Sequence, residues 1–334
     1  MRLRSLLVAA LLATAPQAVL AWGSTGHRII GRLAIETLPA DLPAFLRSRG
    51  AAEAIGELAR EPDRWRGAGR IHDADRDPGH FVDIDDAGKV LGGPALASLP
   101  ITRESYESSL REAGSSSWKA GYLPYSIVDG WQQLTKDLAY WRAATAGAKL
   151  ASNPAHRAWL AEDATRREAL VLRDLGVLAH YVGDGSQPMH VSVHFNGWGP
   201  GPNPEGFTEE KIHAYFEGEF VRDYLNPTAV RAAMTPYRDC HCAIETRTAD
   251  YLAATRGTVA PLYRLWKAGG FENGDARGRA FAAERLAAGA DELRDEVVEA
   301  WKASANADVG WPAVKVADVI AGKADPFDAL YGTD

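Results

Sequence analysis

The chain has 334 residues, of which 46% are hydrophobic, and a formal net charge of -7 at pH 7. This length and composition suffice for one large domain with a substantial core, and no internal repeat or low-complexity linker divides it. The acidic balance argues against broad duplex binding through a basic patch, so a phosphate substrate would need locally fixed cations.

Residues 1–21 have the features of a secretory signal peptide. Two arginines near the start precede an apolar run at residues 6–13, and small residues ending at Ala21 form a cleavage site. The apolar run is too short to span a bilayer, and no later stretch approaches roughly 20 consecutive apolar residues. We therefore expect a domain of residues 22–334, exported to the periplasm or the medium, without a transmembrane segment.

Cleavage after Ala21 would make Trp22 the first residue, with His27 five positions on. A free α-amino group can bind a metal when neutral, and the carbonyl oxygen of the same residue can close a five-membered chelate. His27 is expected on the inward side of a helix, together with Ile30 and Ala34. A hydrogen-bonded core histidine is the alternative interpretation.

Two loop-like segments then add ligand-type side chains, Asp63 with Arg66 and His80 with Phe81. A helical turn would put the Arg66 guanidinium on the side of Asp63, where it could hold a phosphate oxygen or simply form a surface ion pair. Sites tend to lie on such loops. His72 is a weaker ligand candidate, because an aspartate-rich loop is more often solvated.

The region from residue 105 to residue 141 is rich in aromatic side chains, most of which we expect in the core. Apolar residues at helical spacing predict a helix over about residues 126–142. The turn around Tyr122 is the part of this region best placed to reach a substrate.

The strongest chemical signal comes next in the chain. An apolar stripe of helical period places His180 and Asp184, four residues apart, on the opposite face of a helix, and Gly176 is expected to leave that face open. An imidazole and a carboxylate at this spacing can grip one cation. Pro188 ends the helix and re-aims His190 toward a different point, which indicates a second metal nearby.

A further helix, predicted over residues 208–225, carries His213 and Glu217 at the same spacing. Imidazole and carboxylate ligands at helical spacing thus occur twice, a repetition that packing alone does not explain. His194 follows His190 by four residues beside a Gly/Pro-rich loop and is a weaker candidate.

The remaining sequence carries less chemistry. Cys240 and Cys242 are the only cysteines, so we expect no disulfide framework, and a metal role for the Cys-His-Cys run lacks a fourth ligand in the sequence. A helix is predicted over residues 283–301, followed by an irregular tail from about residue 302. No stretch reads clearly as strand, so the expected fold is mainly α, a single compact multi-helix domain, and no obligate protein partner is evident.

In combination, these motifs resemble the zinc-dependent phospholipases C and the single-strand-specific zinc nucleases of the S-one/P-one type, from residue 22 to about residue 301. The motifs are an N-terminal Trp with His five residues on, Asp-x-x-Arg, His-Phe-x-Asp, His-Tyr-x-x-Asp-x-x-Gln-Pro-x-His, and His-x-x-x-acid. The resemblance implies the helical fold of that superfamily and a cluster of three zinc ions. The ligands that it implies are Trp22, His27, Asp63, His80, His180, Asp184, His190, His213 and Glu217.

The resemblance also implies how these ligands divide. One zinc would take Asp63, His80, His180 and Asp184. A close neighbour would take the amine and carbonyl of Trp22, His27 and the other oxygen of Asp184. The third would take His190, His213 and Glu217.

The activity implied is phosphodiester hydrolysis, with Asp63, Arg66 and Asp184 as catalytic residues. The N-terminal spacing and the set of Asp63, Arg66 and Phe81 resemble the nuclease branch. This favours an endonuclease that cuts single-stranded DNA and RNA to 5′-mononucleotides, with Arg66, Phe81 and Tyr122 contacting the substrate.

Two other functions stay open at this point. The Gln-Pro-Met-His run and the acid at Glu217 resemble the phospholipases, so a zinc-dependent phospholipase C acting on phospholipid is the alternative. Its aromatic loops around Tyr122 and Trp198 would then contact lipid. A non-catalytic, exported zinc-binding protein is the alternative of another class.

Overall fold

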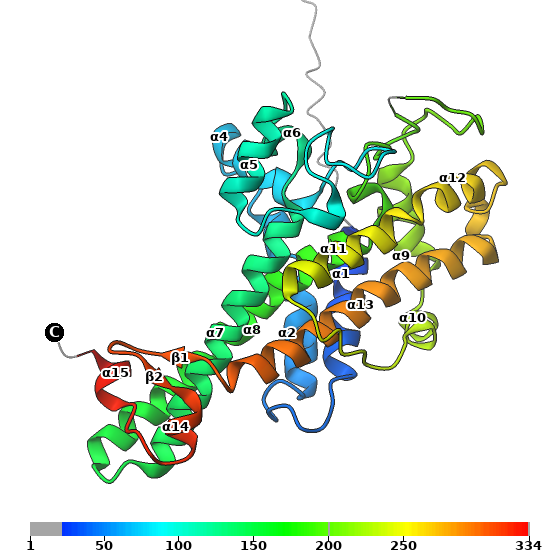
Figure 1. The fold of residues 1–334 in the computed structure, drawn as a ribbon. Coiled ribbons are helices and arrows are strands. Elements are labelled where there is room, and N and C mark those ends of the chain that lie inside the picture. Colours follow the sequence, from blue (N-terminus) through cyan, green and yellow to red (C-terminus); the bar gives the residue numbers. More distant parts are fainter. Residues whose placement is uncertain (1–21, 200, 333–334) are drawn as a thin grey trace, which may run out of the picture.

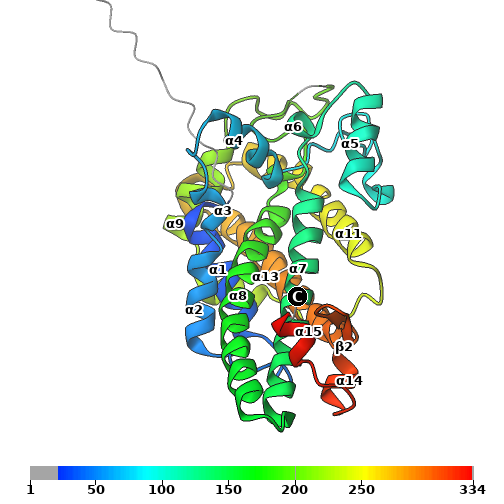
Figure 2. The ribbon, with the colours of Figure 1, turned by 90° about the vertical axis from the view of Figure 1, so that its left-hand side faces the viewer.

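The structure is a computed structural model that describes residues 22–199 and 201–332, so the expected signal peptide lies outside the described residues. Its frame consists of three long helices that pack side by side, α7 (Leu123–Leu150), α8 (Pro154–Ser186) and α13 (Ala276–Ser304) (Figures 1 and 2). The side chain of Asn153 caps α8 by accepting a hydrogen bond from the Ala155 N–H at 2.9 Å.

Helices α1 (Gly23–Glu36) and α2 (Arg49–Leu58) complete this body by packing against α8, and α1 also packs against α13. The apolar faces meet in one core, in which side chains such as Ile30, Leu178 and Leu286 are fully buried. Burial of these stripes stabilises the long helices far more than local propensity does.

Short elements gather at the end of the frame where α8 stops. Helices α4, α5 and α6 lie there in both ribbon views (Figures 1 and 2). The elements from residue 61 to residue 190 outside the frame are α3 (Glu61–Arg64), α4 (Arg70–Arg76), η1 (Asp77–His80), η2 (Leu96–Ser98), α5 (Arg103–Glu112), α6 (Ser117–Ala120) and η3 (Pro188–His190). Those between η3 and α13 are η4 (Tyr215–Phe220), α9 (Val221–Tyr224), α10 (Pro227–Ala233), α11 (Ile244–Arg256), α12 (Val259–Lys267) and η5 (Glu272–Gly274).

The prediction of a mainly helical, single compact domain is confirmed. The segments predicted as helices over residues 126–142 and 283–301 lie inside the longer α7 and α13. Among the described residues, none of the helices combines the length and the apolar character that crossing a membrane requires.

The prediction of a helix over residues 208–225 was wrong about where the helix starts and about its geometry. Helical structure begins only at His213, passes into the π-helix η4 and ends with α9. The side-chain oxygen of Asn196 accepts the His213 N–H at 3.2 Å, so a residue from a distant loop stabilises this helix start. Local sequence carries no signal for such a cap.

The tail from residue 302 was expected to be irregular, and this was wrong. It forms a small subdomain beside the far end of α7. Strands β1 (Asp308–Val309) and β2 (Val314–Lys315) pair antiparallel, and α14 (Val316–Ile320) and α15 (Phe327–Tyr331) follow. Strands of two residues are too short to show a period of two, so no pattern in the sequence indicates them.

The pairing of the two cysteines was not expected from the sequence. Cys240 and Cys242 are joined in a disulfide, so both sulfur atoms are occupied. The disulfide leaves no free thiol in the Cys-His-Cys run for a metal, a role for which the sequence already lacked a fourth ligand.

Candidate metal centre

Residues that are far apart in the sequence converge in three buried groups, each of which could hold a metal ion. In each group the ligand atoms lie within 4.8 Å of one another. The groups are His27, His180 and Asp184; Asp63, His80 and His180; and His190, His213 and Glu217.

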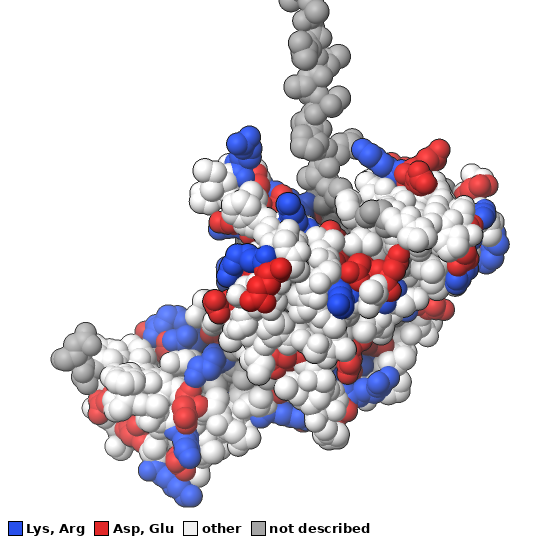
Figure 3. All heavy atoms as spheres, turned by 45° about the horizontal axis from the view of Figure 1, so that its top comes forward, with Lys and Arg blue, Asp and Glu red and all other residues white. Residues whose placement is uncertain are grey.

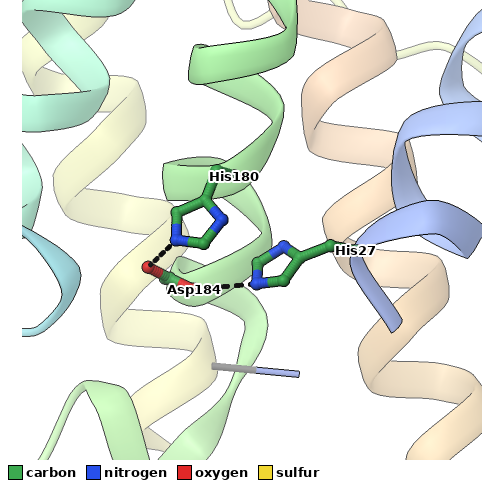
Figure 4. A group of neighbouring side chains, drawn as sticks. All are labelled: His27, His180 and Asp184. Carbon is green, nitrogen blue, oxygen red and sulfur yellow. Dashed lines mark ion pairs between the residues drawn. The ribbon is translucent and has the colours of Figure 1, made fainter. Parts of the chain in front are cut away.

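The first group joins α1 to α8 (Figure 4). Asp184 lies between two imidazoles, with Oδ1 3.5 Å from Nε2 of His27 and Oδ2 3.4 Å from Nε2 of His180. The two rings are stacked with centroids 4.1 Å apart. One carboxylate therefore presents a different oxygen to each imidazole, the arrangement that a bridging ligand between two cations needs.

The second group adds α3 and η1 on the other side of His180. Nδ1 of His80 lies 2.8 Å from Nε2 of His180 and 3.1 Å from Oδ2 of Asp184. Asp63 contributes Oδ1 at 4.0 Å from Nε2 of His180. His180 belongs to both groups, so these two candidate sites are immediate neighbours.

The third group lies where η3 meets the start of η4. Nε2 of His213 is 2.7 Å from Oε2 of Glu217, and Nε2 of His190 is 3.6 Å from the same oxygen. The two imidazole nitrogens are 3.1 Å apart. The break at Pro188 thus turns His190 toward a different point from Asp184, as predicted from the proline.

Two backbone carbonyls set the orientation of two of these imidazoles. Nδ1 of His180 donates to the carbonyl of Ala59 at 2.8 Å, and Nδ1 of His190 donates to the carbonyl of His80 at 2.7 Å. A proton held on Nδ1 leaves the Nε2 lone pair free to face its group, which is the outer-shell pattern of metal-binding histidines.

Burial keeps three imidazoles in the form that binds metals. It lowers the pKa of His80 and of His180 well below the ordinary value, and it lowers the pKa of His190 in the same direction. The neutral imidazoles of His80 and His180 supply lone pairs but no charge to balance Asp63 and Asp184.

The Arg66 guanidinium beside Asp63 does not offset the burial of Asp63 and Asp184. Burial raises the pKa of Asp184 well above its ordinary value, and the Asp63 carboxyl adds to this; burial likewise raises the pKa of Asp63 to about 6. For Glu217, burial opposes ionisation, but the imidazoles of His213 and His190 outweigh it and lower the pKa to about 2. Divalent cations would keep all three carboxylates ionised, so the donor set fits bound metal.

Close helix packing depends on two glycines of α8. A Cβ at Gly183 would lie 3.0 Å from Nδ1 of His27, so glycine gives that imidazole its room. Gly176 was expected to leave the ligand face open, and this was wrong: a Cβ there would lie 2.3 Å from Cβ of Leu58. Gly176 instead lets the end of α2 approach, next to the Ala59 carbonyl that orients the His180 ring.

Trp22 is fully buried beside the same part of α8. Its indole N–H lies 2.9 Å from the carbonyl of Gly183 and 2.8 Å from Oγ of Ser186, two residues that flank Asp184. Its carbonyl accepts the N–H of Gly26 at 3.1 Å. These bonds anchor Trp22 at the metal groups, while its role as a ligand through amine and carbonyl stays a prediction.

A cavity of about 310 Å³ opens directly beside the second and third groups. Its walls include His80, His190 and His213. Arg66, with Nε 3.3 Å from Oδ1 of Asp77 and a second nitrogen 3.5 Å from Oδ1 of Asp63, also lines it. The other lining residues are Asp77, Phe81, Asp83, Lys119, Met189 and Phe195.

Three candidate residues do not reach this cavity. The Tyr122 hydroxyl donates to the Asp75 carbonyl at 2.6 Å, and the ring lies under the Arg103 guanidinium. His72 is exposed on α4. His194 is stacked on Trp198, with Nε2 3.1 Å from Asp86.

Several residues at the site have no individual role predicted from the sequence, although Gln187 and Asp83 belong to the motifs. Gln187 donates to Oε2 of Glu217 at 3.1 Å and so positions a ligand. Asp83 lines the cavity, and burial raises its pKa to about 7. It follows Phe81 by two residues on extended backbone, where side chains at that spacing share a face, so this one could have been found. Phe195 lies next to His194, at the start of the Gly/Pro-rich loop that was expected to border the site, whereas Lys119 carried no such signal.

A comparison with models of known protein families found no match, and no curated protein matches the chain either. The geometry of the site therefore carries the functional argument.

Proposed function

We propose that this chain is a zinc-dependent phosphodiesterase of the phospholipase C and single-strand nuclease superfamily, and that it hydrolyses single-stranded DNA and RNA to 5′-mononucleotides. The observation that carries the proposal is the cavity whose walls combine three histidines of the candidate metal groups with two cations and two aromatic rings.

Zinc suits the donor set, because five imidazoles and three carboxylates form the groups and zinc prefers nitrogen with carboxylate oxygen. Calcium and magnesium prefer sites built from oxygen alone. Zinc bound by these residues would act as a Lewis acid on a phosphate oxygen and lower the pKa of water.

The side chains of the cavity suit a nucleotide. Arg66 offers a forked donor to phosphate oxygens, although Asp63 and Asp77 already bind part of it. Phe81 and Phe195 offer ring faces for stacking, which requires an unpaired base and therefore a single strand. The Asp83 carboxyl can accept a hydrogen bond from a base amino group.

The distribution of surface charge suggests that the cavity, and not the surface as a whole, attracts the substrate. On the face shown in Figure 3, acidic and basic side chains are interspersed among uncharged ones. Lys119 and Arg66 are the basic residues that line the cavity. Steering of a polyanion by this face would be weak, so recognition depends on the cavity itself.

The packing of Tyr122 and, in part, of Trp198 speaks against the phospholipase alternative. Tyr122 is 9% exposed. Trp198 packs on His194, Phe207 and Tyr263. The Tyr122 ring is therefore withheld from a lipid, whereas the half-buried Trp198 ring is only partly covered.

The proposal is tested by incubating the purified, zinc-loaded protein with single-stranded DNA, RNA and phosphatidylcholine, each with and without chelator. We expect both nucleic acids to be cut to 5′-mononucleotides, with activity lost on chelation and restored by zinc. His190→Asn should lower kcat/KM at least about 100-fold, since it removes a metal ligand, while His72→Asn, on the exposed part of α4, should leave it unchanged. Cleavage of lipid alone would establish the phospholipase alternative, and no cleavage of any substrate would leave only a zinc-binding protein.

A further inference from the structure

A second cavity, of about 510 Å³, lies away from the metal groups, between α11, α13 and the segment of residues 234–243. None of the candidate metal ligands lines it. The segment contributes Cys240, one half of the disulfide, to its wall. A disulfide sulfur at the edge of a cavity can be approached by a molecule bound there.

The Cys240–Cys242 disulfide contributes little to holding the fold together. It closes a ring within one segment, with only His241 between its ends, and links no two helices. Stabilisation by a disulfide grows with the length of the loop that it closes, so this one constrains the unfolded chain least. Cys242 and His241 are exposed to solvent.

Other bonds hold the segment in place along α13. The N–H of Thr235 donates to Asp291 at 2.8 Å, and the N–H of Cys240 donates to Glu299 at 3.2 Å. Lys302 pairs with Asp239 at 2.7 Å. The segment can therefore keep its position when the disulfide opens.

The cavity carries charges of both signs. The Arg285 side chain lines it, and its buried Nε has no hydrogen-bond partner within the part of the chain that the structure describes. Burial also lowers the pKa of Arg285, which an anionic partner would reverse. The carboxylates of Asp250 and Glu284 line the same cavity.

We infer that the Cys240–Cys242 disulfide is an exchange site for a small zwitterionic thiol, such as a peptide thiol, bound in this cavity. A carboxylate of the thiol compound pairs with Arg285, and its ammonium group lies toward Asp250 or Glu284.

The exchange itself proceeds in two balanced steps. The incoming thiolate bonds to Sγ of Cys240, the disulfide breaks, and Cys242 leaves as a solvated thiolate that takes a proton from water. A second thiolate then attacks the mixed disulfide and releases the small-molecule disulfide, leaving both cysteines reduced.

The test measures how fast the purified full chain is reduced by glutathione and by 2-mercaptoethanol at equal thiolate concentration, with alkylation and mass measurement as the readout. Glutathione should react about tenfold faster, the factor that one charged hydrogen bond can supply. Arg285→Ala should abolish this preference. Arg277→Ala, which removes an exposed arginine of α13 that does not line the cavity, should keep it.

Two further measurements keep the result clear if Arg285→Ala folds poorly. S-methylglutathione, which has no thiol, should slow reduction by glutathione but not by 2-mercaptoethanol. The melting curve of the natural chain should change little on reduction. Equal rates for both thiols, cysteines recovered as thiols before any reductant is added, or reduction only on unfolding would each overturn the inference. None of these outcomes depends on the proposed phosphodiesterase activity.

Discussion

At the metal groups, two imidazoles and one carboxylate are oriented by hydrogen bonds to residues outside the groups or to backbone atoms. The Ala59 carbonyl holds the Nδ1 proton of His180, the His80 carbonyl holds that of His190, and Gln187 donates to the carboxylate of Glu217. Loss of such outer-shell partners typically costs 10- to 100-fold in metal affinity. The precision of the groups therefore depends on the surrounding backbone as much as on the ligands.

Gly183 offers the sharpest test of that dependence. In Gly183→Ala the new methyl group would lie 3.0 Å from Nδ1 and 3.2 Å from Cε1 of His27, so the imidazole must move. We expect zinc affinity of the first group to fall by about 10- to 100-fold, the range for disturbed outer shells. Titration of the metal-free protein with zinc, read by calorimetry, measures this.

Gly218→Ala is the matched control, because a Cβ there meets no atom within 4 Å although the neighbouring residue is the candidate ligand Glu217. Its zinc titration should match that of the natural chain. Equal affinities for both variants would mean that His27 does not bind metal in the position seen here.

At the scale of single helices, α13 buries an acidic side chain, Glu296, that would ordinarily lie in solvent. Glu296 is fully buried in its middle, and within the described residues neither carboxylate oxygen has a hydrogen-bond partner. Burial raises its pKa well above the ordinary value, and the neighbouring Glu292 adds to this. The other charged groups acting on it are Arg247 on α11, with Asp295 and Glu299 on α13.

This burial predicts a pH-dependent cost to stability. The folded state keeps the Glu296 proton at pH values where the unfolded state has lost it, so the free energy of unfolding falls as pH rises above about 4.5. Glu296→Gln removes this loss. Its stability relative to the natural chain should rise between pH 5 and pH 8, by at most about 1.4 kcal/mol per pH unit.

Denaturant unfolding of both proteins across this pH range measures the difference. Glu104→Gln, at an exposed position of α5, is the control and should run parallel to the natural chain. A constant difference between Glu296→Gln and the natural chain would show that Glu296 ionises in the folded protein as it does in the unfolded one.

For the molecule as a whole, the metal groups bring together side chains from distant segments. Their residues run from His27 on α1 to Glu217 on η4, and they meet where α8 ends. Bound cations would neutralise the buried carboxylates and tie these elements together, whereas the unfolded chain lacks the site.

Removal of metal should therefore lower the melting temperature of the entire domain. Zinc at about a thousand times its dissociation constant would contribute about 4 kcal/mol, which for a chain of this size corresponds to a shift of roughly 6 °C. Thermal melts with zinc, with chelator and after zinc is restored measure the shift. An unchanged melting temperature in a protein shown by elemental analysis to have bound and lost zinc would contradict this role.

The sequence alone determined what depends on local spacing. The four-residue interval between His180 and Asp184 on a strongly periodic segment predicted one ligand face, and Pro188 predicted a change of direction at His190. Both are seen in the structure, because helix geometry and the missing proline N–H act within a few residues. The mainly helical fold followed from the same periodicity.

Only the tertiary structure decided what depends on contacts between distant segments. The start of the helix at His213 depends on Asn196, the room for His27 depends on Gly183, and the burial of Tyr122 depends on Asp75 and Arg103. The cavity beside the metal groups likewise collects residues from η1, α6 and η3 and from the segments that connect other elements. Local periodicity carries no information about such pairs, because their energies arise only after the helices have packed.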